Sequence, residues 1–407
     1  MLHPVAGGTL ARMWRSVFVP TVILSFAEGM LVPVLPLYLA VLGAPFWWVG
    51  LVLAAEGIGM LLADLPAGAL LRRIDRKAAM LAGIGLLGLA SLAMAATDSV
   101  GALFALRLTA GLGAALWGIS RHAYLTDSVP LKQRGRTIAA FGGAHRIGLF
   151  VGPAVGGVLA AAFGFQAAFL AYGAVAAVAL VFCARYLERH PRRPDLGARP
   201  STGGGAGAWT AVWRGRGRLL LAAGAGNLMA AAIRAGRRIV IPLAGATLLG
   251  LDVQQVGWIV SAAAGVDVVM FPLAGWIMDR HGRKRAIVPS FALQALGMAL
   301  VPLAGGFWGL LLAACVIGFG NGIGSGTMMT LGADLAPPEA VGEFLGTWRL
   351  IGDAGAMGGP VLVGALADVL SLPAATLAIA AVGLGAVLVF AYGMPETLPR
   401  PVPARPV

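Results

Sequence analysis

Residues 275–284 read GWIMDRHGRK and join two long apolar runs, which lie near 253–278 and 286–305. The joining stretch holds one Asp, two Arg and one Lys, whereas the flanking runs are almost free of charge. Each run has about the 20 residues that an α-helix needs to cross the hydrocarbon core of a bilayer. The sequence therefore predicts two antiparallel transmembrane helices joined by a short basic turn.

The composition of the whole chain extends this prediction. The 407 residues are 59% hydrophobic and 12% charged, whereas a soluble domain carries about 25% charge. A chain of this length that folded in water would need a polar surface, but a surface in contact with lipid does not. The net charge of +13 could indicate nucleic-acid binding, but the position of the charges follows a membrane pattern, so we expect no nucleic-acid partner.

Apolar runs recur along the chain and predict an all-α membrane protein with twelve transmembrane helices. A stretch rich in Arg, Pro and Gly, residues 188–216, interrupts them and predicts a linker. We therefore expect an N-terminal six-helix bundle at 1–187 and a C-terminal one at 217–407. The expected helices lie near 16–41, 46–71, 78–97, 99–124, 136–163, 166–187, 218–245, 253–278, 286–305, 307–331, 341–367 and 373–394.

Charges in the connections predict the orientation. The odd-numbered connections hold Asp98, Asp252 and Asp368 and no Lys or Arg, whereas the even-numbered connections are basic. Because basic connections stay in the cytoplasm, both termini are predicted to be cytoplasmic. Richness in Ala and Gly and a preference for Arg over Lys suggest a bacterial inner membrane.

The sequence also repeats itself at a constant offset of 207 residues, through loops as well as helices. Two pseudo-symmetric six-helix halves in parallel orientation follow, with the solute path at their interface. Matching positions include Gly68 and Gly275, Arg76-Lys77 and Arg283-Lys284, Asp127 and Asp334, and Pro130 and Pro337.

Several motifs resemble those of the major facilitator superfamily. Residues 275–284 are similar to its loop motif GxxxDRxGRK, and Arg107-Leu-Thr-Ala-Gly111-Leu-Gly113 is similar to its motif RxxxGxG. Residues 148–157, GLFVGPAVGG, resemble the antiporter motif GxxxGPxxGG. The resemblance implies the major facilitator fold and a likeness to twelve-span drug/proton antiporters. It assigns the antiporter motif to Gly148, Gly152, Pro153, Gly156 and Gly157.

The N-terminal copy of the loop motif departs from the family pattern. Residues 68–77 read GALLRRIDRK, so Arg72 stands where the family has Asp. In the family this position contacts the opposite half and closes the cytoplasmic side. We therefore expect swapped pairs, Arg72 with Glu343 and Asp279 with Arg136. The predicted gate and loop residues are Gly68, Arg72, Arg73, Arg76, Arg136, Gly275, Asp279, Arg280, Gly282, Arg283 and Glu343.

Twelve charged residues lie inside the predicted spans and more than two residues from their ends, seven Arg and five acidic residues. Such charges are costly in lipid and usually serve a function. Glu28 lies near the middle of the first span, where a carboxyl group in a low-dielectric cavity could bind and release a proton. The resemblance implies that Arg107 takes part in proton coupling. The predicted substrate-binding residues are Glu28, Arg146, Arg234, Arg237, Arg238, Asp267, Arg349 and Asp353.

These observations predict a secondary active transporter that exports small amphipathic organic compounds in exchange for protons by alternating access. One alternative is a transporter of a specific anionic or zwitterionic metabolite, which the Arg side chains in the seventh span favour. A less favoured alternative is a non-transporting sensor or enzyme on the same scaffold. No catalytic motif is present, and we expect no cofactor or metal. The expected partners are a small-molecule substrate, protons and the lipid bilayer, and the protein is expected to be a monomer.

Overall fold

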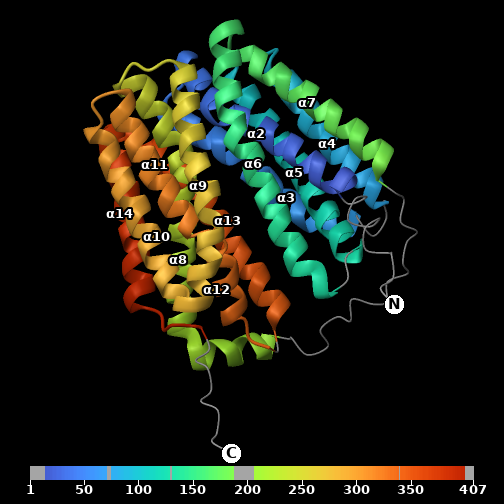
Figure 1. Ribbon diagram of the computed structural model, residues 1–407, viewed down its shortest axis with the longest axis vertical. Helices are drawn as coiled ribbons and strands as arrows, with labels where there is room; N and C mark the ends of the chain where they lie inside the picture. Colours follow the sequence, from blue (N-terminus) through green and yellow to red (C-terminus); the bar gives the residue numbers. More distant parts are fainter. Residues whose placement is uncertain (1–13, 71–74, 129–130, 188–205, 339, 399–407) are drawn as a thin grey trace, which may run out of the picture.

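The computed structural model describes residues 14–70, 75–128, 131–187, 206–338 and 340–398 (Figure 1). Twelve helical segments of this part are long and apolar enough to cross a membrane, which confirms the predicted twelve-span, all-α membrane fold. The helices of the first half are α2 (Val19–Val41), α3 (Phe46–Leu70), α4 (Arg76–Met94), α5 (Val100–Ser128), α6 (Leu131–Phe163) and α7 (Phe165–Tyr186). Those of the second half are α8 (Ala206–Leu243), α9 (Val253–His281), α10 (Arg283–Leu300), α11 (Phe307–Ile323), α12 (Thr327–Leu335), α13 (Val341–Val369) and α14 (Leu372–Tyr392).

Two helices begin earlier than the sequence predicts. Helix α6 begins at Leu131, so Arg136 lies inside a helix and not in a connection. Helix α8 begins at Ala206, so the second part of the expected linker is helical. The first part of the expected linker, residues 188–205, lies outside the described residues. Polar helical turns that extend beyond the bilayer carry no apolar signal, which is why the hydropathy pattern misses them.

The tenth span is divided, although the sequence predicts one continuous helix. It consists of α11 and α12, separated at Gly324-Ser325-Gly326. Gly326 has a φ of +76°, a left-handed conformation that glycine adopts without steric cost. The carbonyl oxygen of Gly324 accepts hydrogen bonds from Thr327 Oγ1 at 2.7 Å and from the Arg234 guanidinium at 2.8 Å. The break therefore lies at membrane depth only because protein donors satisfy its backbone.

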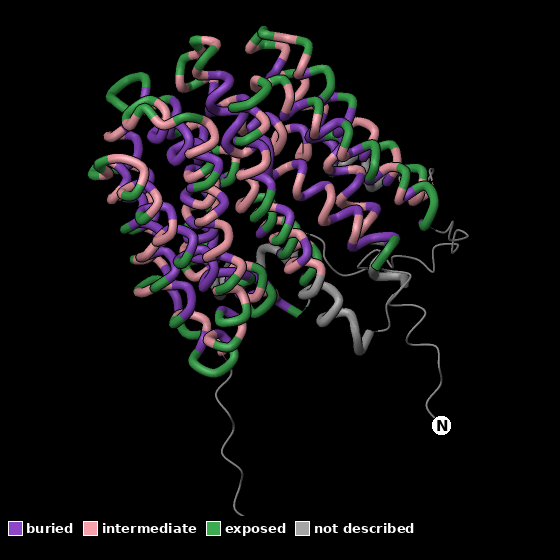
Figure 2. The backbone as a smooth tube through the Cα atoms, turned by 45° about the horizontal axis from the view of Figure 1, so that its top comes forward, coloured by how far each residue is buried: buried purple, intermediate pink, exposed green. Residues whose placement is uncertain are grey.

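The outer surface of the helices is apolar. Figure 2 shows buried residues along the inner sides of the helices and exposed residues along their outer sides. Large apolar side chains within the spans are exposed, among them Leu89, Val181, Leu312 and Leu388. Such a surface would be unfavourable in water but is suited to lipid tails. The cores of the two halves are packed mainly with small and aliphatic side chains.

The sequence repeat is also a repeat of contacts. Lys77 Nζ donates to the carbonyl oxygens of Ala184 and Leu187, at 2.6 and 2.7 Å. In the second half, Lys284 Nζ donates to the carbonyl oxygens of residues 391 and 394, at 2.6 and 2.8 Å. All three positions are shifted by the same 207 residues. The two halves therefore share one internal architecture, as the repeat predicts.

The halves meet along two helix pairs, α3 with α13 and α6 with α9. Gly50 of α3 packs against the backbone of Pro360, and Gly257 of α9 packs against the backbone of Pro153. These two contacts are equivalent under the repeat, with the roles of the halves exchanged. A Cβ atom at either glycine would overlap the opposite backbone, so the absence of a side chain is what allows this approach.

A second pair of glycine contacts lies closer to the turns that precede α3 and α9. Gly157 packs against the first residues of α9, and Gly364 packs against the first residues of α3. We call this end of the molecule, with the α2–α3 and α8–α9 turns, the closed end. Helices α6 and α9, which come from different halves, run side by side in Figure 1.

At the closed end, one half caps a helix of the other. The backbone N–H groups of Phe46 and Trp47, which begin α3, donate to the carboxylate of Asp368 at 2.9 and 2.7 Å. The equivalent helix α9 is capped by its own Asp252, in a capping box with Gln255. The position equivalent to Asp252 is Pro45, whose side chain offers no acceptor. Helix α3 therefore takes from the opposite half the cap that its own sequence lacks.

Candidate functional site

An ion pair between α6 and α9 connects the two halves within the membrane. Arg146 Nη1 lies 2.5 Å from Asp267 Oδ1, and Asn321 Nδ2 donates to the other carboxylate oxygen at 2.7 Å. The guanidinium of Arg146 also lies over the ring of Phe271, 4.9 Å from its centroid. Both charged side chains are largely buried. This arrangement brings together two predicted site residues and adds Asn321, which the sequence analysis did not identify.

A second ion pair connects the halves between α2 and α8. Arg238 Nη1 lies 3.7 Å from Glu28 Oε1, and the side chains are 50% and 34% exposed. The repeat predicts that Glu28 and the Arg residues of α8 lie at matching depth, and the structure places Arg238 opposite Glu28. One helical turn before Glu28, the hydroxyl of Ser25 forms a hydrogen bond with Nδ1 of His145 on α6, at 2.5 Å.

Arg107, in contrast, is paired inside one half. Its guanidinium donates to the carboxylate of Glu56, which brings α5 and α3 together. Both side chains are largely buried, and Arg107 Nε has no acceptor among the described residues. The resemblance gives Arg107 a role in proton coupling, and this remains a prediction. Its carboxylate partner is Glu56, to which the sequence analysis gave no role.

Three further arginines of the spans have no carboxylate within ion-pair distance among the described residues: Arg121, Arg234 and Arg237. The guanidinium of Arg121 lies over the rings of Phe141 and Trp117, at 4.2 and 5.3 Å from the centroids. That of Arg234 lies 4.9 Å from the ring centroid of Phe291. Aromatic faces attract these cations, but they do not neutralise them.

Arg349 and Asp353 form a local pair. They lie one turn apart on α13, with Arg349 Nε 3.6 Å from Asp353 Oδ2, and both side chains are about half exposed. This ion pair lies within one helix and does not cross between the halves. Their assignment to substrate binding therefore remains a prediction that this pair neither supports nor contradicts.

The intact loop motif forms a network inside the second half. Arg283 Nε donates to Asp334 Oδ2 at 3.0 Å, and its Nη1 lies 3.3 Å from Asp279. Thr397 Oγ1 donates to the same Asp334 oxygen at 2.9 Å. The network ties the α9–α10 turn to the end of α12 and to the segment after α14. It therefore holds one end of the second half together as a unit.

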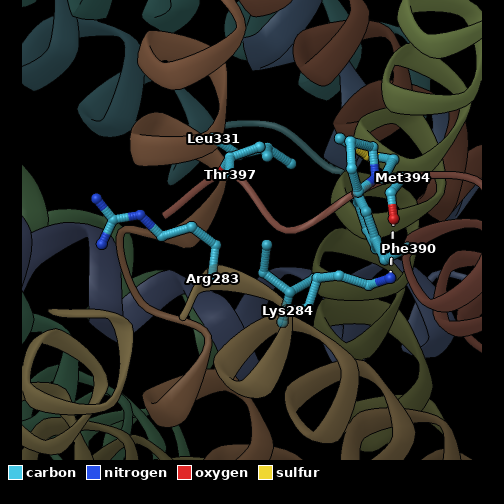
Figure 3. Close-up of a pocket in the computed structure, with 8 residues that line it drawn as sticks. Arg283, Lys284, Leu331, Phe390, Met394 and Thr397 are labelled. Atoms are coloured by element: carbon cyan, nitrogen blue, oxygen red, sulfur yellow. Dashed lines mark hydrogen bonds between the residues drawn. The ribbon is translucent and has the colours of Figure 1, made fainter. Parts of the chain in front are cut away.

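A small pocket lies beside this network (Figure 3). Figure 3 shows the Lys284 side chain reaching the carbonyl oxygen of Met394, whereas the Arg283 side chain points away from Met394. The pocket leaves room for about one water molecule. It is too small for an organic substrate, so the charged interface between the halves is the better candidate site. The lining residues are Arg283, Lys284, Ile287, Leu331, Phe390, Met394, Pro395 and Thr397.

Glu396 caps the first turn of α10. Its carboxylate accepts backbone N–H groups from Arg283 at 2.8 Å, from Lys284 at 3.1 Å, and from Thr397 and Leu398 at 3.0 Å each. Burial alone raises the pKa of Glu396, but these four donors outweigh burial and hold the pKa below its usual range. The ionised form is therefore the one that stabilises the fold.

Glu396→Gln should lower the free energy of unfolding by about 0.5–1 kcal/mol at neutral pH, because a weaker acceptor replaces an exposed capping carboxylate. A group whose native pKa is lowered stabilises the fold above its unfolded pKa and loses this effect as the pH falls through its native pKa. The difference between the proteins should therefore shrink as the pH falls from neutral through the native pKa of Glu396. Denaturant unfolding in micelles at neutral and at acidic pH measures it, and an equal difference at both would contradict this role.

The predicted swapped-charge gate is only partly within the described residues. Arg72 and Arg73 lie outside them, as do the surroundings of Gly68 and the side chain of Arg136. Asp279 is 80% exposed, with Arg283 as its neighbour. The pairs Arg72–Glu343 and Asp279–Arg136 therefore remain predictions.

The glycines of the antiporter motif form a close helix contact. Gly148, Gly152 and Gly156 of α6 pack against the backbone of α2, and Gly152 lies against Gly29. These three glycines lie at intervals of four residues and form a flat face for this close contact. It belongs to packing within the first half, whereas Pro153 and Gly157 of the same motif contact α9. The role of the motif in antiport remains a prediction.

Comparisons with known proteins agree with this architecture. An uncharacterized MFS-type transporter of Methanocaldococcus jannaschii is 22% identical over 370 residues, which cover 90% of this chain and 94% of that protein. The methylenomycin A resistance protein of Streptomyces coelicolor is 36% identical over 135 residues, 33% of this chain and 28% of that protein. The match to this resistance protein thus spans less than a third of its length.

Solved structures show the same fold. The crystal structure of the nucleoside transporter NupG superimposes with a TM-score of 0.74 at 14% identity, and the alignment covers 92% of this chain and 97% of that one. A family profile described as Major Facilitator Superfamily matches residues 17–233 and 227–407. Together these two matches cover nearly the whole chain and both halves of the repeat. The protein is a member of the major facilitator superfamily of membrane transporters.

Proposed function

We propose that the protein is a secondary active transporter that exports small amphipathic organic compounds in exchange for protons, by alternating access to a site between its halves. Relatives include the methylenomycin A resistance protein and multidrug resistance protein 2 of Bacillus subtilis, which support export of organic compounds. The observation that carries the proposal is that two ion pairs cross the interface inside the membrane, Arg146–Asp267 and Glu28–Arg238. Movement of one half against the other would change both.

The proposed orientation has both termini in the cytoplasm, and the basic connections support it. In this orientation the closed end faces outward, and the proposed conformation is an inward-facing one. We propose residues 1–187 and 217–407 as the two moving units, joined by 188–216. We further propose that the protein acts as a monomer in a bacterial inner membrane.

The partners of each carboxylate decide which can couple transport to protons. Glu56 and Arg107 belong to the same half, so their pair moves as a unit and keeps its environment. The ion-pair partners of Glu28 and Asp267 belong to the opposite half, and Arg121 of the first half also lies within electrostatic range of Glu28. A carboxylate that loses its cation when the halves separate can take up a proton, and it releases the proton when the cation returns. Glu28 is the more exposed of the two and is the proposed proton carrier.

Transport by purified protein in liposomes tests the proposed function. Liposomes with an acidic interior are supplied with 1-naphthoate, 1-naphthamide or 1-naphthylmethylammonium, and their uptake is measured by fluorescence against protein-free liposomes. Uptake of at least one compound that depends on the protein and is abolished by a protonophore supports proton exchange. Uptake that is unchanged when the pH gradient is removed contradicts it.

Asp368→Ala should shift the population toward a conformation in which the closed end is open. The substitution removes the acceptor of Phe46 and Trp47, and Pro45 cannot replace it. Hydrogen bonds to a charged group contribute about 1.5–3 kcal/mol each when buried, but these are exposed, so the pair should contribute about 1–2 kcal/mol. A population shift of roughly 5- to 30-fold follows. Distances between spin labels across the closed end measure it.

Asp252→Ala is the matched control for this prediction. Asp252 caps α9 from within its own half, so its loss should lower stability without changing the distance between the halves. If Asp368→Ala leaves the spin-label distances of the wild type unchanged, the cap does not help to hold the closed end.

A further inference from the structure

Two arginines of α8 with unused donors lie near the interface, within electrostatic range of Arg146 of the opposite half. Arg234 and Arg237 are three residues apart and so lie on one face of the helix. One nitrogen of Arg234 donates to the carbonyl of Gly324, and Phe291 covers its guanidinium face. Its Nε is buried without an acceptor among the described residues. The side chain of Arg237 has no hydrogen bond or ion pair to any described residue.

The nearby carboxylates are already engaged. Both arginines lie within electrostatic range of Asp267 and Arg146. One oxygen of Asp267 is bound by Arg146 and the other by Asn321. The remaining carboxylate, Glu28, faces Arg238. Five guanidinium groups thus surround two carboxylates at this point of the described interface: Arg121, Arg146, Arg234, Arg237 and Arg238 around Glu28 and Asp267.

A surplus of cations at membrane depth needs an anion. Arginine stays protonated in proteins, so it cannot avoid the cost of burial by losing its proton. A buried charge without a counter-ion is strongly unfavourable, and charges in transmembrane segments usually mark a substrate or ion pathway. The planar guanidinium has donors that fit carboxylate or phosphate oxygens.

The broken tenth span supports the same location. Arg234 reaches the carbonyl of Gly324 at the interruption between α11 and α12. In transporters, interrupted helices occur where the backbone lines a solute cavity. The unused donors of Arg234 therefore lie next to the kind of backbone that such cavities contain.

We propose that the site between the halves binds an anionic group, a carboxylate, sulfonate or phosphate, through Arg234 and Arg237. The inference rests on the proposed function in that it assigns a substrate class to the same site. The exported compound is then an amphipathic anion whose acidic group is held by α8. Its apolar part is free to contact a partly exposed aromatic side chain of the interface, Phe271, over which the guanidinium of Arg146 lies.

Binding to the purified full-length protein in micelles tests this site without requiring transport. The probes 1-naphthoate, 1-naphthamide and 1-naphthylmethylammonium share one skeleton and differ in charge. We expect naphthoate to bind about ten- to a hundredfold more tightly than the other two, because charge-assisted hydrogen bonds are lost in both. Equal affinities, tighter binding of the ammonium compound, or no binding of naphthoate would overturn the proposal.

Variants locate the site. Arg237→Gln should weaken naphthoate binding about tenfold or more and leave naphthamide unchanged. Arg237→Lys retains the charge and should give an intermediate loss, which provides a second test if the Gln variant does not fold. Arg218→Gln is the matched control, because Arg218 lies exposed on the same helix. Naphthoate affinity that is equal in wild type and Arg237→Gln would overturn the assignment.

The two proposals can fail separately. If naphthoate binds through Arg237 but is not moved in liposomes by a pH gradient, the proposed transport of this class fails and the anion site stands. If the ammonium compound is exported while naphthoate does not bind, proton-coupled export stands and the anion site is wrong.

Discussion

Glu28→Gln should abolish transport driven by a pH gradient and leave exchange of substrate across the membrane largely intact. Gln has nearly the same shape and can still form a hydrogen bond with Arg238, which lies 3.7 Å from the carboxylate. The Gln side chain cannot alternate between a charged and a protonated form. The change between the two conformations of the transporter is therefore no longer linked to uptake and release of a proton. Accumulation under a pH gradient and counterflow without one, in the same liposomes, measure the two properties separately.

Glu56→Gln is the matched control, because Glu56 is also a carboxylate paired with an arginine in a span. Its partner Arg107 belongs to the same half, so the environment of the pair should not alternate. The variant should be destabilised by about 3 kcal/mol, because a buried arginine loses its counter-ion. Transport by the folded fraction should nevertheless still be driven by the pH gradient. Loss of coupling in Glu56→Gln, with coupling retained in Glu28→Gln, would move the proton carrier to the Glu56–Arg107 pair.

The repeat explains why the sequence could place Glu28 opposite the arginines of α8. An offset of 207 makes Leu31 equivalent to Arg238 and Ala27 equivalent to Arg234. Equivalent positions in a pseudo-symmetric pair of bundles lie at equal depth, so Glu28 had to lie near the level of these arginines. The repeat could not select one of them, because that choice depends on the rotation of α8 and on side-chain rotamers.

The same repeat explains why the Glu56–Arg107 pair was missed. The equivalent positions in the second half are Ala263 and Ala314, so no second copy marks this contact. In the structure, the backbone of Ala263 packs directly against Gly318, and the backbone of Glu56 packs in the same way against Gly111. Both halves therefore share this close helix contact, and the first half adds a buried ion pair that the second, with alanine at both positions, cannot form. Only the three-dimensional arrangement of α3 and α5 reveals the partner.

The hydropathy pattern does not predict the division of the tenth span, for a different reason. Residues 318–326, GFGNGIGSG, are rich in glycine, but so are several continuous spans of this chain. Glycine is tolerated in transmembrane helices because neighbouring helices can satisfy the backbone. Two features decide the break. Gly326 has a positive φ, and the carbonyl oxygen of Gly324 accepts a hydrogen bond from Arg234 of another helix. Tertiary contacts of this kind leave no local signal in the sequence.

Asp267→Leu should lower the free energy of unfolding by about 3–5 kcal/mol, because it leaves Arg146 buried without a counter-ion. The double variant Arg146→Leu/Asp267→Leu should recover much of this loss, since two apolar side chains can pack where two charges had to be kept together. Denaturant unfolding of the wild type, both single variants and the double variant in micelles gives a double-mutant cycle. We expect a coupling energy of roughly 1–3 kcal/mol.

The pair Arg349 and Asp353 supplies the control, because it is about half exposed and lies within one helix. Its cycle should give a coupling energy of at most about 0.5 kcal/mol. The contrast separates a buried bond between the halves from a local pair on a helix surface. If the losses for Arg146→Leu and Asp267→Leu simply add in the double variant, the two residues do not form the bond between α6 and α9. Among the described residues, Glu28–Arg238 would then be the one remaining ion pair between the halves at this depth that their movement could break.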